Sequence, residues 1–501
     1  MKSLKPSKGV SVPGSTCTRL SATVQYNPSQ VMKTEPQLPP GPSRLAASRM
    51  LWTAGSRFLQ FLQDTAKTYG DIAHFKVGPR RYYLLSHPDD IHDILVKNAD
   101  RFIKGPALRQ SQVTLGQGLL TSEHDLHRRQ RQLITPAFHP RQVQSYTQTM
   151  LDFTRQRIAS WHDQQRLDIK EEMTQLTLQI VAKVLFDADL ADDVRAIGEA
   201  MAVTVTMFDR VRSPLAPILN RLPLPANYRF KRALRHLREV IEQMIQQRRS
   251  STATHGDLLS LLLGACNANP VGAGSPRPLS IGQATKEGGE TPPLQKMSDQ
   301  QLRDEMITLF TAGHETTANA LVWTLVLLAQ HPDVESKFHE ELSQSDTPGP
   351  YVRAVLSESM RLYPPAWVIG RECIQDHEVR GYRLPVGSVI LVSQWVTHRD
   401  PRWFLDPKKF NPDRWLCNPS HPRYAYFPFG GGPRSCIGEP FAWNEATVLL
   451  STIARQWKLK LIDSNPIPLH PTITLRPAGP VWMTAHAQQP ATSLSPVAVG
   501  T

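Results

Sequence analysis

A single cysteine lies in a glycine-rich segment whose composition suits a metal-bound thiolate. The segment reads Phe429-Gly430-Gly431-Gly432-Pro433-Arg434-Ser435-Cys436-Ile437-Gly438. Glycines allow tight turns and close approach to a flat ligand, and Arg434 could pair with a carboxylate of that ligand. Cys436 directly precedes a predicted helix, where unpaired N–H groups and the helix dipole favour a thiolate. The alternative is an inert buried cysteine beside a glycine-rich turn.

The remaining cysteines give no sign of a second metal site. Cys17, Cys266, Cys373 and Cys417 complete a set of five, and no pair has the C-x-x-C spacing of zinc or iron–sulfur sites. An odd number of cysteines also argues against a disulfide framework. We therefore expect a reducing compartment, the cytoplasm.

A second candidate site interrupts a long apolar helix. Ser298 and Gln301 form a predicted capping box, and no proline follows before Pro332, so a helix of about 30 residues is expected. Its middle reads Ala312-Gly313-His314-Glu315-Thr316-Thr317. A threonine hydroxyl can bond the carbonyl four residues earlier, or release it and open a groove for water or O₂. An acid beside this alcohol suits proton delivery; a solvated turn is the alternative, but the apolar surroundings argue against it.

Together these segments resemble the cytochrome P450 superfamily. The cysteine segment matches the haem-binding pattern F-x-x-G-x-R-x-C-x-G, and the helix segment is similar to the oxygen-activation motif of the family. Glu358 and Arg361 match the E-x-x-R motif, which in the family is joined by an arginine of a later meander, here Arg414. The motifs stand in the order of the family, and the resemblance covers residues 38–485.

The resemblance implies haem b, held between a long central helix and the cysteine loop. The expected fold is mainly α with small antiparallel β-sheets. The chain itself predicts a helix near 56–69, a hairpin over 72–85, a strand near 386–391 and a last helix near 440–456. By resemblance, Cys436 is the axial iron ligand, Glu315 and Thr316 deliver protons, and Gly313 forms the O₂ groove.

Further residues are expected to contact the haem. His127 and Arg131 share a helix face at spacing i, i+4 and resemble a propionate-binding pattern of the family, as does Arg371. A solvated basic helix is the alternative for 127–131, and Arg128 and Arg129 would point elsewhere, toward a redox partner. The expected cofactor contacts are Cys436, His127, Arg131, Arg371, Arg434, Phe429, Gly430, Gly438 and Ala312.

The resemblance implies a monooxygenase that inserts one atom of O₂ into an apolar substrate, with a fatty acid, an alkane or a terpenoid as candidates. Pocket walls are expected from residues 103–119, 201–225 and 366–369 and from Val481. No part of the chain resembles a flavin or iron–sulfur module, so we expect electrons from an acidic ferredoxin or flavodoxin with its reductase. A peroxide-driven or rearranging enzyme of this fold and a non-catalytic haem gas sensor remain as alternatives.

Charge and hydropathy restrict the partners. The chain has 57 Lys and Arg against 44 Asp and Glu, but no nucleic-acid-binding signature accompanies this +13 charge. No apolar stretch reaches the ~18 residues of a membrane span. We expect a disordered basic arm over 1–37, a catalytic domain over 38–485 with a mobile loop at 267–296, and a flexible tail over 486–501.

Overall fold

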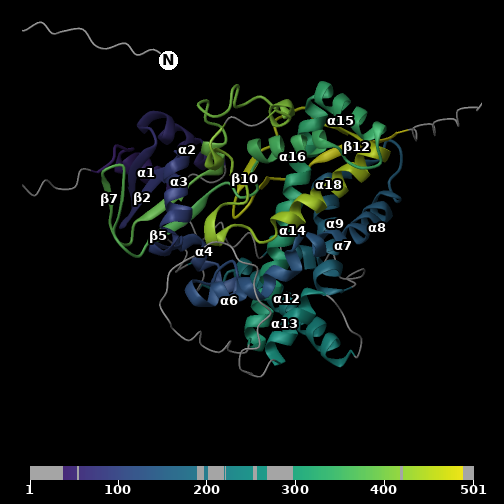
Figure 1. The fold of residues 1–501 in the computed structure, drawn as a ribbon, viewed down its shortest axis with the longest axis horizontal. Coiled ribbons are helices and arrows are strands. Elements are labelled where there is room, and N and C mark those ends of the chain that lie inside the picture. The colour runs from purple at the N-terminus through teal and green to yellow at the C-terminus, as the bar shows by residue number, and fades with distance from the viewer. Residues whose placement is uncertain are drawn as a thin grey trace, which may run out of the picture. The chain divides into compact units, whose positions relative to one another are not determined.

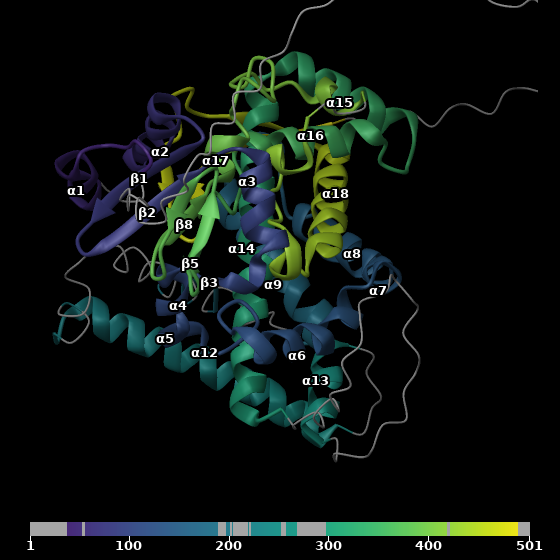
Figure 2. The same ribbon diagram turned by 60° about the vertical axis from the view of Figure 1, so that its left-hand side comes forward.

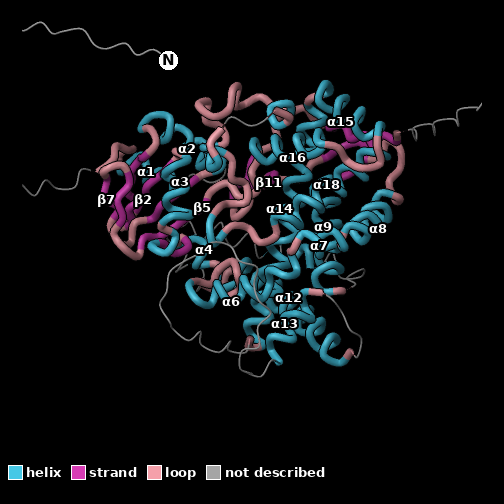
Figure 3. Tube along the Cα trace, in the orientation of Figure 1, coloured by secondary structure: helices cyan, strands magenta, loops and turns pink. Residues whose placement is uncertain are grey.

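The computed structural model describes residues 38–52, 56–188, 197–200, 203, 219, 222–251, 257–267, 297–417 and 421–488. The expected arm at 1–37 lies outside these residues, as do the expected loop apart from Asn267 and the expected tail from 489 onward. The described part is rich in helices, which Figure 3 shows in cyan. The last strand continues to Ala487, two residues past the expected end of the domain at 485.

The α-helices carry the labels of Figure 1. They are α1 (Arg44–Trp52), α2 (Ser56–Tyr69), α3 (Pro88–His92), α4 (Pro106–Gln110), α5 (Gln112–Leu115), α6 (His124–Ile134), α7 (Pro140–Ser145), α8 (Thr147–Ile158), α9 (Ile169–Phe186), α12 (Pro225–Ser250), α13 (Leu258–Asn267), α14 (Asp299–Gln330), α15 (Pro332–Gln344), α16 (Pro350–Leu362), α17 (Gln394–Thr397) and α18 (Glu439–Gln456).

The strands form small sheets. They are β1 (Ile72–Val77), β2 (Arg80–Leu85), β3 (Phe102–Lys104), β4 (Arg166–Asp168), β5 (Ile369–Cys373), β6 (His377–Val379), β7 (Tyr382–Leu384), β8 (Val389–Val392), β9 (Trp457–Leu461), β10 (Leu469–Pro471), β11 (Leu475–Pro477) and β12 (Trp482–Ala487).

One sheet has five strands in the order β1-β2-β8-β5-β3, and the others join β4-β12-β9, β10-β11 and β6-β7. All pairs are antiparallel except β2 with β8, which the sequence analysis did not foresee. The mainly α fold with small antiparallel sheets is otherwise confirmed, and in Figure 1 the five-stranded sheet lies with α1–α3 on the left.

The expected strand over 386–391 begins later, at Val389. Gly387 has a φ of +82°, which extended L-residues do not adopt, so residues 385–388 form a turn. The expected helices near 56–69 and 440–456 and the hairpin over 72–85 are confirmed by α2, α18 and β1–β2. Turn geometry at a single glycine therefore explains the misplaced strand boundary.

The central helix α14 is the longest described element, with 32 residues. The predicted capping box is confirmed: Ser298 Oγ accepts from Gln301 N, and Gln301 Oε1 accepts from Ser298 N. Figure 2 shows α14 running through the helical part of the protein, where it contacts α9 and α18. Packing on several sides explains why the helix is apolar almost all round.

A buried carboxylate joins α16 to the meander that leads to the cysteine loop. Glu358 accepts from Arg361 Nε and Nη2 at 2.8 Å each and from Arg414 Nε at 3.0 Å. Asn411 N and Trp415 Nε1 also donate to it, at 3.0 and 2.9 Å. Burial works to raise the pKa of Glu358, but the two guanidinium groups outweigh it and lower the pKa.

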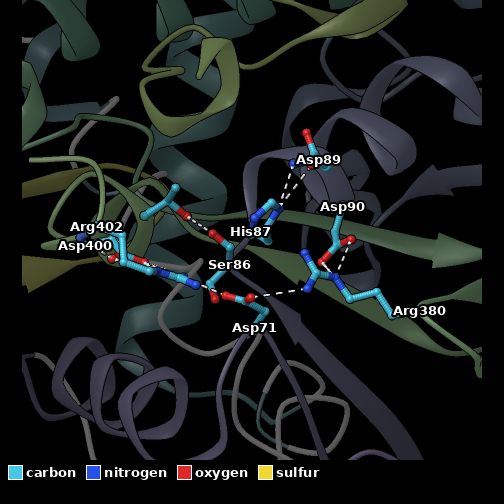
Figure 4. Close-up of polar contacts among 9 residues, drawn as sticks. Asp71, Ser86, His87, Asp89, Asp90, Arg380, Asp400 and Arg402 are labelled. Atoms are coloured by element: carbon cyan, nitrogen blue, oxygen red, sulfur yellow. Dashed lines mark hydrogen bonds and ion pairs between the residues drawn. The ribbon is translucent and has the colours of Figure 1, made fainter. Parts of the chain in front are cut away.

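A more exposed ion network joins β1, α3 and the segment after α17 (Figure 4). Arg402 contacts Asp71 and Asp400 at 2.6 Å each, and Arg380 contacts Asp90 at 2.8 Å. Because Asp71 is shared by both arginines, the start of β1 is tied to two distant parts of the chain. Such networks near solvent contribute little per pair.

We predict that Glu358→Gln lowers the free energy of unfolding by about 3–5 kcal/mol, because two buried guanidinium groups lose their counter-charge. Urea unfolding followed by circular dichroism measures this difference. Asp125→Asn is the matched control, since Asp125 pairs with Arg128 on the exposed surface at 2.6 Å and should cost under about 1 kcal/mol. Equal losses of unfolding free energy in the two variants would contradict the larger contribution that we assign to the buried network.

Candidate haem-binding site

The cysteine loop has a fixed backbone. Cys436 N donates to Phe429 O at 2.9 Å, which closes the loop on itself. Gly430 and Gly432 have φ values of +73° and +70°, in the region that favours glycine. A Cβ at Gly432 would lie 1.9 Å from Leu95 O, so only glycine fits there. The loop therefore presents Cys436 immediately before α18.

The thiol of Cys436 is accessible to a water-sized sphere although protein atoms surround it. Its accessible surface therefore faces an opening within the protein. Burial raises the pKa of Cys436 to about 11, although Gly438 N–H and Arg131 work to lower it. Desolvation therefore outweighs the hydrogen bond and the cation that favour the thiolate. A metal ion would supply the missing charge.

The middle of α14 also has accessible surface. From Asp304 to Leu328 every residue is buried except Ala312, Gly313, Glu315 and Thr316, which are half-buried. A helix packed on several sides exposes its middle only where an opening lies beside it. Thr317 of α14 acts on Glu445 of α18 through its hydroxyl, so this stretch of α14 lies beside the helix that follows the cysteine loop.

Thr316 bonds back to its own helix, as the sequence analysis expected for a groove-forming threonine. Its Oγ1 donates to Ala312 O at 2.9 Å, and Thr317 Oγ1 donates to Gly313 O at 3.4 Å. A Cβ at Gly313 would lie 3.1 Å from Val181 Cγ2 of α9. Gly313 therefore also permits close packing of α9 on α14, a structural role besides the proposed groove.

Glu315 does not point toward Thr316. Its Oε1 accepts from Thr474 Oγ1 at 2.6 Å and lies 3.8 Å from Arg476 Nη1, both on the β10–β11 hairpin. Adjacent residues of a helix point about 100° apart. The structure thus separates the two side chains that were expected to act as a pair. His314 is buried, and its Nδ1 lies 2.6 Å from Phe310 O.

Basic side chains gather on one side of the cysteine loop. This basic cluster consists of Lys104, His127, Arg131, Arg371 and Arg434, which act on one another electrostatically. Arg131 Nη1 donates to Ser435 O at 2.7 Å, and Arg434 Nη2 contacts Glu123 Oε2 at 2.9 Å. The structure therefore brings together the four basic residues that the sequence analysis assigned to haem propionates.

His127 differs from the expected cation. Burial and the neighbouring positive charges lower its pKa to about 3, so the ring is neutral at physiological pH and acts only as a hydrogen-bonding group. Burial also lowers the pKa of Lys104 to about 7 and that of Arg371 to about 10. Burial is the largest cause of each shift, and neighbouring positive charges lower each pKa further.

The basic cluster fits haem b. Among the described residues, Glu123 is the carboxylate in direct contact with the cluster, where it pairs with Arg434. Two propionates would supply the missing negative charge. Together with the accessible thiol and the small residues of α14, this charge deficit matches a planar cofactor with an iron ligand on one face and carboxylates at one edge.

The structure supports the other residues that were expected to contact the haem or to line the substrate pocket to different degrees. Phe429 and Gly430 are half-buried in the loop, and Phe429 packs against Trp443 with ring centroids 5.7 Å apart. Gly438 has room for a Cβ, so its identity is not required by packing. Val481 and Trp367 are buried in the core at 2% and 3% exposure, so they are not pocket walls. Most of 201–225 lies outside the described residues.

A groove on the cysteine side is lined by residues that include His127, Arg128, Arg131 and Arg434. Arg128 is exposed and pairs with Asp125 at 2.6 Å. Arg129, in contrast, is half-buried. Of the two arginines expected to face a redox partner, only Arg128 lies at this groove.

Comparison with known proteins shows the family of the chain. The cytochrome P450 family pattern matches residues 39–482. Among similar proteins, cyclooctatin synthase of Streptomyces melanosporofaciens is 36% identical over 85% of this chain and 90% of its own. Cyclooctat-9-en-7-ol 5-monooxygenase of the same organism is 35% identical over 84% and 88%. Pentalenene oxygenase of Streptomyces avermitilis is 30% identical over 83% and 91%.

Solved structures support the fold. The retinoic acid-bound cyanobacterial CYP120A1 superposes with a TM-score of 0.75 at 23% identity, over 90% of this chain and 100% of that one. The haem domain of cytochrome P450DA gives the same TM-score and identity, over 90% and 98%. The predicted resemblance and fold are thereby confirmed. Within the described residues, every helix is too short or too polar to cross a membrane.

Sequence reasoning missed two buried charged residues, Lys104 of the basic cluster and Glu445 of α18. Lys104 shares a strand face with buried Phe102, and Glu445 lies four residues after buried Phe441 on the apolar face of α18. A charged residue on an apolar face is the signal that could have revealed them. Among the described residues, neither oxygen of Glu445 has a well-aligned hydrogen-bond partner. The Thr317 hydroxyl works to lower the pKa of Glu445.

We predict that Glu445→Gln changes how stability depends on pH. Burial raises the pKa of Glu445 to about 8 in the native protein, against about 4.3 in an unfolded chain. The native state keeps a proton that the unfolded state releases, so the wild type loses stability as pH rises through this window. Urea unfolding should show the variant gaining on the wild type up to about pH 8. A difference independent of pH would contradict the raised pKa.

Proposed function

The chain belongs to the cytochrome P450 family, and we propose that it oxidises a terpenoid-type apolar substrate with electrons from a separate redox protein. Family membership makes the protein a monooxygenase that binds haem b. Its general requirements are an organic substrate, O₂ and a redox partner. The accessible stretch of small residues in the otherwise buried α14, beside the helix that follows the cysteine loop, is the observation that carries the proposal.

In this proposal Cys436, the basic cluster and Thr316 have different roles. Cys436 holds the iron through its sulfur, and the basic cluster binds the propionates. When bound, the haem supplies the redox chemistry that places one oxygen atom of O₂ in the substrate and releases the other as water. Thr316 holds a proton on Oγ1, which it now donates to Ala312 O. Release of that carbonyl would make the hydroxyl available in the helix groove.

The substrate proposal follows from the opening and from the relatives. Ala312 and Gly313 offer no polar group beyond their backbone, so this side of the opening favours an apolar ligand. The names of two relatives denote an unsaturated alcohol and an unsaturated hydrocarbon. A cyclic terpenoid therefore fits better than the fatty acid or alkane that the sequence also allowed.

The redox partner is proposed to be an acidic ferredoxin or flavodoxin. The groove on the cysteine side carries Arg128, whose side chain is 70% exposed, beside Arg131 and Arg434. Positive charge at the edge of a site steers acidic partners. A cytoplasmic location is part of the same proposal, and the four cysteines of the described part are all free thiols.

We predict that Cys436→Ser removes the thiolate signature of the haem. The reduced wild type under carbon monoxide should show the absorption band of a thiolate-ligated haem, because the sulfur donates electron density to the iron. The hydroxyl of serine cannot do this. Cys417→Ser, at an exposed thiol, is the control and should keep the band. Retention of the band in Cys436→Ser would refute the assignment.

We predict that Thr316→Ala lowers the fraction of electrons found in product by about tenfold or more, because proton delivery loses its hydroxyl. Product and peroxide are measured against electrons consumed. Thr324→Ala is the matched control, since Thr324 makes the same back-bond to Ala320 O at 2.7 Å in a buried part of α14. Full coupling in Thr316→Ala would contradict the proposed role of Thr316. A gas sensor would form no product in either protein, and turnover with peroxide alone would favour a peroxide-driven enzyme.

A further inference from the structure

The β10–β11 hairpin is docked on one face of α14. Glu315, Asn319 and Trp323 recur at spacing i, i+4, i+8 and so share a helix face. Each bonds the hairpin: Thr474 Oγ1 donates to Glu315 Oε1 at 2.6 Å, Asn319 Nδ2 donates to Thr474 Oγ1 at 3.3 Å, and Trp323 Nε1 donates to Leu475 O at 3.2 Å. The position of the Glu315 carboxyl is therefore determined by the hairpin as well as by its own helix.

The contacts of Thr474 leave its hydroxyl a single orientation. The oxygen accepts from Asn319 and its one proton goes to Glu315. Thr474 is 4% exposed, so water does not compete for this bond from outside. Hydrogen bonds to a carboxylate are shorter and stronger than those between neutral groups. Thr474 thus acts on Glu315 with a fixed, buried donor.

Arg476 provides a second influence on Glu315. Its Nη1 lies 3.8 Å from Glu315 Oε1, and its side chain is 12% exposed. Lys170 also acts on Glu315 electrostatically and donates to Pro477 O of the same hairpin at 3.3 Å. Positive charge therefore reaches the carboxyl from the hairpin side, away from Thr316.

We propose that Thr474 and Arg476 are positioning residues that hold Glu315 for proton delivery. This inference rests on the proposed monooxygenase function. Since Glu315 and Thr316 point in different directions, a proton can pass between them only if the Glu315 carboxyl is held where water or a side-chain rotation can bridge the gap. The hairpin, rather than α14 alone, then determines how well electron consumption is coupled to product.

The test compares Thr474→Val with Thr472→Val. Valine keeps the shape of threonine and removes the hydroxyl. Thr472 lies in the same turn, and its hydroxyl donates to Thr474 O at 3.2 Å without contacting Glu315. Thr474→Val should lower the coupled fraction of electrons several-fold, toward about tenfold, and raise the solvent deuterium isotope effect on kcat, with KM unchanged. Thr472→Val should leave all three as in the wild type.

A spectroscopic readout is independent of turnover. The infrared stretching band of carbon monoxide on the reduced haem responds to hydrogen-bond donors and charges near the ligand. A loosened Glu315 should broaden or split this band in Thr474→Val and Arg476→Gln, and Thr472→Val should show the wild-type band. Identical bands in Thr474→Val and Thr472→Val would overturn the proposal, because a purely structural turn residue predicts that result.

A double-mutant cycle with Glu315→Gln separates this inference from the proposed function. If Thr474 acts through Glu315, adding Thr474→Val to Glu315→Gln should cause no further loss of coupling. An equal additional loss would overturn the positioning role while the monooxygenase activity of the wild type still stands. Absence of product and of the thiolate band in the wild type would instead refute the proposed function itself.

Discussion

The buried carboxylate of Glu358 is the interaction on which the cysteine loop depends. It receives five hydrogen bonds, from Arg361, Asn411, Arg414 and Trp415. Arg361 in turn donates to His398 O at 2.9 Å, and the His398 ring accepts from Phe427 N at 2.9 Å, two residues before the loop begins. An irregular segment has no ladder of its own, so its course must be set by such side-chain contacts. The geometry of Cys436 therefore rests on a charge network in α16 and the meander.

The central helix α14 packs in the core and also borders the candidate site. Trp323 of α14 stacks on Tyr363 with centroids 4.2 Å apart, which packs the C-terminal half of the helix. Four residues near its middle, Ala312, Gly313, Glu315 and Thr316, remain accessible. Close packing of α9 at Gly313 and of the hairpin at Glu315 leaves Ala312 and Thr316 as the part directed at the opening. A small residue is thus needed at Gly313 for packing, and small residues at Ala312 and Thr316 leave room for a ligand.

The sequence was informative where a local pattern determines the structure. The capping box at Ser298 and the hairpin over 72–85 follow from local spacing, and both are present. The arginine network of Glu358 was expected from the family resemblance, and it is present as well. Sequence failed where the answer depends on a distant segment. The direction of Glu315 is set by a hairpin about 160 residues later. The lowered pKa of His127 comes from burial and from four other basic residues, and the raised pKa of Cys436 comes from desolvation. No local periodicity encodes such tertiary effects.

The electrostatics of the site imply that cofactor binding and folding are linked. Lys104 is 4% exposed, and its Nζ donates to Leu119 O at 2.9 Å while Glu305 Oε2 accepts from Leu119 N at 2.9 Å. The segment before α6 is therefore held between α14 and the basic cluster. Burial lowers the pKa of Lys104 to about 7, and a buried cation with few carboxylate partners is costly to the fold. A ligand that brings carboxylates to this cluster binds the native state alone and so stabilises it. In the proposed function, the charges that bind the propionates therefore also couple haem binding to the stability of the fold.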